Sequence, residues 1–97
     1  MPDYYCTSES DSIDSDRRRL GWEVDSLDSK VMYLNSLMSQ VNLAQSFTYS
    51  SVSYYNSLVD MYNLQLSFYK SSASGYNYNL DRFNRRVRNY NSDCVGP

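Results

Sequence analysis

The chain has 97 residues, a formal net charge of −2, two cysteines and no histidine. This length suits one domain with a modest hydrophobic core, and the negative charge argues against nucleic acid as the partner of the whole chain. The lack of histidine removes the commonest general base and the commonest zinc ligand. Because the sequence also has no glycine-rich phosphate loop and no acidic triplet spaced to bind a metal, we expect a protein that is not an enzyme and needs no cofactor.

Two further features concern membranes and export. No apolar run approaches the roughly 20 residues that span a bilayer, and residues 1–16 lack the basic start and apolar stretch of a signal peptide. We therefore expect a soluble protein without a classical leader. An exported or extracellular location is favoured if the two cysteines form a disulfide, because disulfides persist in oxidising compartments.

In chain order, the predicted elements are a loose arm over residues 1–8, a helix over 9–44, a turn over 45–51 and a second helix over 52–72. From 76 to 92 we expect either a continuation of the second helix or a short third helix. No glycine or proline stands between Trp22 and Ala73, so one very long helix is also permitted. Gly75 is placed to end a helix, but the heptad phase continues beyond it, which favours a kink over a reversal.

A heptad seam runs along most of the chain. Apolar residues recur at alternating steps of four and three, which places them on one stripe of a helix and is typical of coiled coils. The seam residues are Leu20, Val24, Leu27, Val31, Leu34, Met38, Val41, Val52, Tyr55, Val59, Tyr62, Leu66 and Tyr69. The seam lapses at Gln45 and Thr48, in a stretch rich in hydroxyl side chains, which predicts an all-α fold with its turn at 45–51.

Folding the chain about residue 50 pairs seam positions whose numbers sum to 100. Val41 then faces Val59, and the acidic N-terminal part of the chain lies beside the basic C-terminal part. Cys6 and Cys94 also meet in this register, where a disulfide would contribute about 4 kcal/mol of stability. We therefore predict an antiparallel helical hairpin, or coiled coil, within one chain. An antiparallel dimer of long helices makes the same pairs between two chains and remains an alternative.

The cysteine pair is the most specific chemical feature of the sequence. The structural interpretation is a disulfide between Cys6 and Cys94, with two inert thiols as its alternative. The functional interpretations are a redox switch and a metal clip.

A second stripe lies outside the seam. Aromatic and methionine residues recur there at seven-residue intervals, each two positions after a seam position, and a two-helix hairpin would leave much of this stripe exposed. Such surfaces usually mark protein contacts. With a flanking leucine and the lone tryptophan, the candidate partner-interface residues are Trp22, Phe47, Tyr54, Leu58, Met61 and Phe68. A broader core in a three-helix arrangement is the other interpretation of the stripe, and half-buried packing is the other interpretation of Trp22.

Two basic runs stand at Arg17–Arg19 and between Arg82 and Arg88. The functional interpretation is phosphate binding, with Phe83 and Tyr90 as stacking aromatics. We favour the other interpretation, in which these arginines are solvated and pair with acidic side chains.

The acidic composition, the small size, the lack of a leader and the hairpin pattern resemble the small helical proteins of type VII secretion, namely the ESAT-6-like (WXG100) proteins and the short partners of LXG-domain toxins. The resemblance implies a helical hairpin that packs against another hairpin, the pair carrying an export signal. The chain departs from the family motifs. Its tryptophan, Trp22, lies near the start of the first helix instead of in a W-x-G turn, and the only Y-x-x-x-D/E spacing is Tyr5 to Glu9, at the opposite end from the family's signal.

These observations predict a non-enzymatic helical module that docks a larger protein, of the secretion-partner or adaptor type, or a second copy of itself. The competing prediction is a structural coiled-coil subunit of a virion, filament or appendage.

Overall fold

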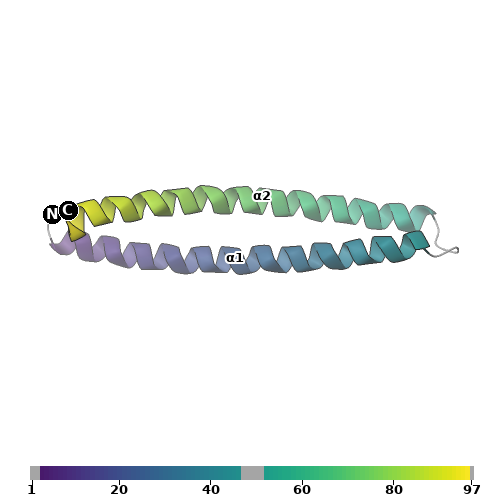
Figure 1. Cartoon of the computed structure of the whole chain (residues 1–97), viewed down its shortest axis with the longest axis horizontal. Coiled ribbons are helices and arrows are strands. Elements are labelled where there is room, and N and C mark those ends of the chain that lie inside the picture. The colour runs from purple at the N-terminus through teal and green to yellow at the C-terminus, as the bar shows by residue number, and fades with distance from the viewer. Residues whose placement is uncertain (1–2, 47–51, 97) are drawn as a thin grey trace. The chain divides into compact units, whose positions relative to one another are not determined.

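The computed structural model describes residues 3–46 and 52–96, and nearly all of them are helical. Helix α1 comprises Asp3–Ser46, helix α2 comprises Val52–Tyr90, and a short π-helix, η1, comprises Asn91–Val95. The two long helices form a hairpin, which confirms the predicted all-α class (Figure 1). Within these ranges no helix combines the length and apolarity that crossing a membrane requires.

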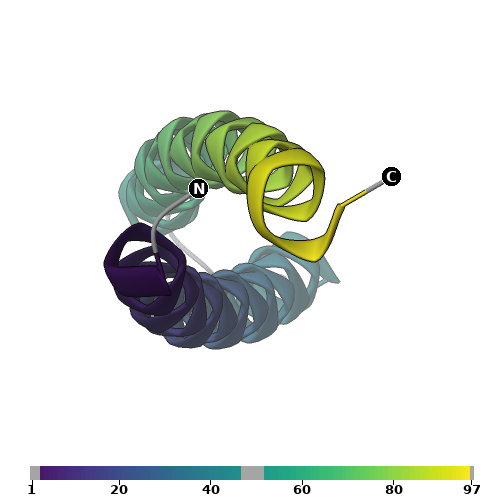
Figure 2. The same ribbon diagram turned by 90° about the vertical axis from the view of Figure 1, so that its left-hand side faces the viewer.

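The chain divides into two compact units, and each helix contributes to both. The terminal unit contains Met1–Asp25 and Ser74–Pro97, and the central unit contains Ser26–Ala73. Figure 2 looks onto the terminal unit, where the start of α1 and the end of α2 lie side by side. In each unit the two helices run antiparallel. In the terminal unit residues near the start of α1 contact residues near the end of α2, and in the central unit residues near the end of α1 contact residues near the start of α2.

The central unit contains most of the apolar core. Leu37 is its most deeply buried residue, with 1% of its surface exposed, and Leu34 is also buried. Val41 and Ala44 of α1 pack with Leu58 of α2, and the half-buried Tyr55 and Val59 lie against this cluster. Close packing of these side chains across the two helices is what holds this unit together.

The terminal unit has a smaller apolar core. Among its described residues the buried hydrophobic side chains are Ile13 and Leu20. The same inward face of α1 also carries Glu9, Asp16 and Glu23, all of them half-buried. This unit therefore encloses a polar seam, which must be satisfied by partners on α2.

The inward face of α1 differs from the predicted seam in one of its two rows. The predicted row of Leu20, Leu27, Leu34 and Val41 does face inward. Each member of the second inward row lies three residues after a member of the first row, whereas the prediction placed it four residues after. The second row consists of Glu9, Asp16, Glu23, Lys30, Leu37 and Ala44. Val24, Val31 and Met38, which were predicted in the seam, are exposed. The prediction was wrong here because it followed apolar residues only, whereas the carboxylates of the other row find partners on α2.

The predicted seam of α2 agrees better with the structure. Its later members, Tyr55, Val59, Tyr62, Leu66 and Tyr69, are all half-buried. Val52 is the exception, with 75% of its surface exposed at the first residue of α2. Its predicted partner position, 48, lies outside the described residues.

Several predicted boundaries also change. The loose arm over 1–8 is wrong for residues 3–8, which belong to α1, and the disulfide from Cys6 ties this segment to η1. Gln45 and Ser46 of the predicted turn are helical, and 47–51 lie outside the described residues. Helix α2 runs without a break through 71–75, so the predicted continuation is correct and the third helix is not formed there.

The chain ends its helical course in η1, a wider turn that the sequence did not predict. The backbone N–H of Gly96 donates to the carbonyl of Asn91 at 3.0 Å and closes this turn. Gly96 has φ of 90°, a left-handed conformation that glycine adopts without steric cost.

Candidate functional site

A disulfide joins the two ends of the helical course. Cys6 of α1 and Cys94 of η1 are bonded, with an S–S distance of 2.07 Å and a Cα–Cα distance of 5.7 Å. This is the pairing that the sequence register predicted. Because each sulfur is bonded to the other, neither is a free thiol or a metal ligand in this structure. Among the described residues no group of histidine, cysteine and carboxylate side chains could hold a metal ion.

Next to the disulfide, one arginine of α2 is held by two carboxylates of α1. Arg86 donates from Nε and Nη2 to the carboxylate of Glu9, and from Nη1 to Oδ2 of Asp16 at 2.9 Å. About a fifth of each acidic side chain is exposed (19% for Glu9, 21% for Asp16), against 37% for Arg86. Bidentate arginine–carboxylate bonds of this kind fix geometry as well as charge.

The pKa of Arg86 is raised in the folded protein, first by its hydrogen bonds to Glu9 and then by those to Asp16, while desolvation opposes the shift. Because the folded-state pKa is raised, the stabilisation linked to the charge of Arg86 is fully present below the pKa of this arginine in the unfolded chain. It is lost as the pH rises through the folded-state pKa, in strongly alkaline solution. Arg86 is thus a permanent cation at any pH of interest.

A second polar pair follows further along the same face. Asn79 of α2 donates from Nδ2 to Oε1 of Glu23 at 2.9 Å. The other carboxylate oxygen, Oε2, is buried and has no hydrogen-bond partner among the described atoms. Leaving a buried acceptor unpaired costs stability, so this pair stabilises the fold less than a fully hydrogen-bonded carboxylate would.

This polar seam was not predicted, although the sequence contains a signal for it. Glu9, Asp16 and Glu23 are spaced by seven residues, and so are Asn79 and Arg86 on the other helix. When each helix of a coiled coil carries a row of polar residues at seven-residue spacing, the side chains of the two rows are expected to pair with each other. The predicted pairing of arginines with acidic residues holds for Arg86 and for two exposed pairs within α1, Arg17–Asp14 at 3.0 Å and Arg19–Asp16 at 3.2 Å.

The central unit presents the other candidate site, an exposed apolar stripe on α2. Tyr54, Met61 and Phe68 occupy one heptad row and have 54%, 43% and 50% of their surface exposed. The exposure predicted for these three residues is therefore observed. We call this row the α2 stripe.

Three other predicted interface residues do not extend the stripe. Leu58 is only 5% exposed and belongs to the core of the central unit, because it packs against Val41 and Ala44. Its prediction as an interface residue is wrong. Trp22 is 70% exposed but lies in the terminal unit, and Phe47 lies outside the described residues.

The central unit exposes further large apolar side chains that were not predicted, including Met32, Leu43 and Leu64. Leu64 follows Met61 by three residues and therefore lies next to the α2 stripe. Inspection of the positions three residues after each member of the stripe would have identified Leu64 from the sequence. The surface available for apolar contact is thus larger than the predicted set.

Comparisons with known proteins add no relative to this picture. No protein-family model, curated protein or solved structure matches the chain. The resemblance to type VII secretion proteins stays a prediction.

Proposed function

We propose that the chain is a non-enzymatic helical interaction module that associates with a second copy of itself through the α2 stripe. The observation that carries the proposal is the exposure of Tyr54, Met61 and Phe68 in one row of α2. Exposed apolar rows of this kind are unusual on a surface that meets only water. Methionine and aromatic residues are also enriched at protein interfaces.

The stripe adjoins the core of the central unit. Tyr54 precedes the buried Leu58 by four residues and Met61 follows it by three, so the three side chains are neighbours on the helix surface. A second hairpin laid on the stripe would continue the existing core and approach the packing of a four-helix bundle. Such an association buries surface that a two-helix hairpin cannot cover by itself.

The charge of the central segment supports a second copy as the occupant. Residues 26–73 contain Asp28, Lys30, Asp60 and Lys70 as their charged side chains, two of each sign. Two copies of this segment can therefore meet without net like-charge repulsion. A two-fold interface uses the same patch on both copies, which a self-complementary apolar row allows.

The test is to replace Tyr54, Met61 and Phe68 together with serine and to measure molar mass by light scattering over a range of concentrations. We expect the wild-type chain to associate as concentration rises and the triple variant to stay monomeric, because the apolar area driving association is gone. Helicity by circular dichroism should remain close to wild type, since all three side chains are exposed.

The matched control replaces Asn56 and Asn63 with serine. These exposed residues have the same seven-residue spacing on α2 but belong to a polar row, and their replacement leaves the charge of the central segment unchanged. The control variant should associate like the wild type. A wild-type chain that stays monomeric at every concentration would overturn self-association, and loss of helicity in the triple variant would show that the stripe is part of the core.

A further inference from the structure

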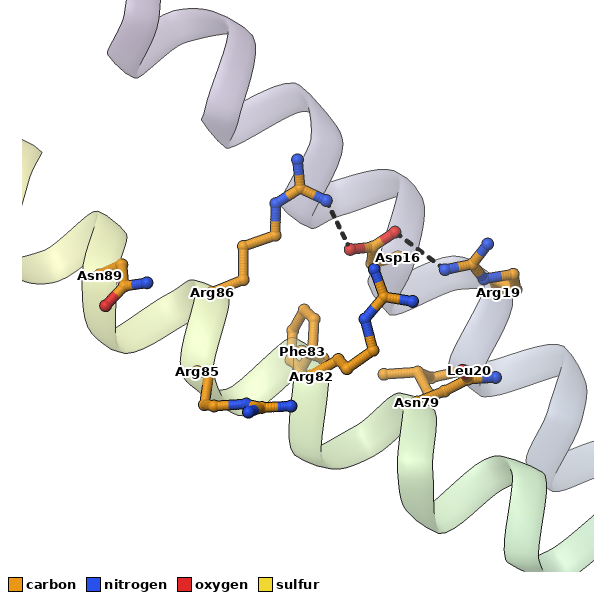
Figure 3. Close-up of a pocket in the computed structure, with 9 residues that line it drawn as sticks. All are labelled: Asp16, Arg19, Leu20, Asn79, Arg82, Phe83, Arg85, Arg86 and Asn89. Carbon is orange, nitrogen blue, oxygen red and sulfur yellow. Dashed lines mark hydrogen bonds and ion pairs between the residues drawn. The ribbon is translucent and has the colours of Figure 1, made fainter.

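The terminal unit carries a basic hollow on its surface (Figure 3). Its volume is about 480 Å³, and it lies between α1 near Asp16 and the part of α2 from Asn79 to Asn89. Asp16 is the one carboxylate among the described residues that line it. The arginines that line it are Arg19, Arg82, Arg85 and Arg86. Positive charge is therefore concentrated here, although the net charge of the chain is −2.

Two of the four arginines already form ion pairs with a carboxylate of α1. Oδ1 of Asp16 accepts a hydrogen bond from Arg19, and Oδ2 accepts one from Arg86. Figure 3 shows both bonds at the upper side of the hollow. Because each oxygen of Asp16 is used and Glu9 also holds Arg86, this part of the hollow is preorganised.

The charges of the other two arginines are not neutralised by an ion pair with a described residue. Arg82 and Arg85 form no ion pair with any described residue, and the guanidinium carbon of Arg82 lies 5.8 Å from the ring centre of Tyr78. Arg85 also lines a neighbouring hollow of about 350 Å³ together with Asp81, yet it makes no ion pair with this carboxylate. An unpaired guanidinium offers a planar fork of N–H donors that matches phosphate oxygens.

We infer that the hollow binds the phosphate group of a small molecule, with Arg82 and Arg85 as the anion-binding residues. The side-chain amide of Asn89 supplies a further donor in the same hollow, and Phe83 offers an aromatic surface to the organic part of the ligand. The volume falls within the roughly 300–1,000 Å³ typical of ligand pockets. This site lies in the terminal unit and does not depend on the association proposed for the central unit.

The experiment titrates inorganic pyrophosphate into the oxidised full chain by calorimetry at an ionic strength of about 0.02 M, where exposed charges are weakly screened. Nuclear magnetic resonance then follows the side-chain amide of Asn89. We expect one bound pyrophosphate per chain and a shift of that amide signal. The double variant Arg82→Gln, Arg85→Gln should weaken binding about 10-fold or more, because both bidentate contacts are lost.

The matched control is Lys30→Gln, Lys70→Gln, which makes the same change in net charge at two residues of the central unit that do not line the hollow. Its affinity should stay within about 2-fold of the wild type, because neither lysine contacts the hollow and both act on it only through the screened long-range field. Equal losses in both double variants would overturn the inference in favour of general electrostatic attraction, and absence of binding would overturn it outright. A single-stranded oligonucleotide that binds much more tightly than pyrophosphate, with a steep salt dependence, would replace the small molecule by nucleic acid.

Discussion

At the scale of single residues, the terminal unit depends on polar contacts that are made across two helices. Arg86 forms ion pairs with two carboxylates that are themselves about four-fifths covered. Its removal is costly because Glu9 would stay partly buried without this partner, and Asp16 would keep only Arg19. Glu23 shows the same principle in a weaker form, since one of its oxygens is already without a partner.

We therefore expect Arg86→Leu to lower the free energy of unfolding by about 1–2 kcal/mol, a value reduced from that of a fully buried pair because Arg86 is partly exposed. Urea denaturation followed by circular dichroism measures this change. Arg85→Leu is the control, because Arg85 is exposed and forms no ion pair among the described residues, so its effect should stay within about 0.5 kcal/mol. Equal effects of the two substitutions would show that the contacts of Arg86 contribute nothing beyond those of a surface arginine.

At the scale of elements, the continuity of α2 is the feature that sequence reasoning left open. Gly75 was placed to end a helix, but the structure keeps it inside Val52–Tyr90, and a Cβ atom added there would meet nothing within 4 Å. Local propensity favours a break at 71–75, and the unbroken heptad phase favours continuation. Continuation wins because a break would remove Tyr76, Leu80 and Phe83 from the packed face of the terminal unit.

Substitution of this glycine distinguishes the two conformations. Gly75→Ala should raise the free energy of unfolding by about 0.5–1 kcal/mol, because alanine has the higher helix propensity and restricts the unfolded chain. Thermal unfolding of the oxidised chain measures the change. A loss of stability would instead indicate that Gly75 has a left-handed conformation and that α2 ends there, since alanine is strained at positive φ. Gly21→Ala in α1, where a Cβ also meets nothing within 4 Å, provides a second measurement of the same effect.

At the scale of the whole molecule, the two units are held together by different kinds of interaction. The central unit has the larger apolar core, with Leu34, Leu37, Val41, Ala44 and Leu58 buried among its described residues. The terminal unit combines a small core with a polar seam and the disulfide between Cys6 and Cys94. The disulfide closes a loop with a sequence separation of 88 residues, which corresponds to about 4.6 kcal/mol in the loop-entropy model. Because both cysteines lie in the terminal unit, we expect loss of this bond to loosen that unit most.

Reduction with a dithiol should therefore loosen the terminal unit first. In hydrogen exchange we expect amides of 3–25 and 76–95 to lose protection while those of 30–45 and 55–70 retain most of theirs. The variant Cys6→Ser, Cys94→Ser should match the reduced chain and should not respond to the dithiol. Equal loss of protection in both units would mean that the chain opens as one cooperative structure.

Part of this protein was determined by its sequence alone. The heptad spacing of apolar residues dictates helices, and the lapse at Gln45 and Thr48 ends the first one nearby. The register that brings Val41 to Val59 also brings Cys6 to Cys94, because both pairs follow the same seven-residue period. The exposure of Tyr54, Met61 and Phe68 follows from the same period, since a narrow seam cannot cover their row.

Only the tertiary structure decided which rows of α1 face inward and whether the pairing lies within one chain. The row of Leu20 and Leu34 has one neighbouring row with Val24 and Val31 and another with Leu37. Because both neighbouring rows contain apolar residues, periodicity does not decide which of the two faces inward. The structure selects the row with Glu9, Asp16 and Glu23, because Arg86 and Asn79 lie opposite and satisfy most of its polar atoms. The intrachain disulfide selects the hairpin over a dimer of long helices. Both choices depend on contacts between residues far apart in the chain, which a periodic pattern on one helix does not contain.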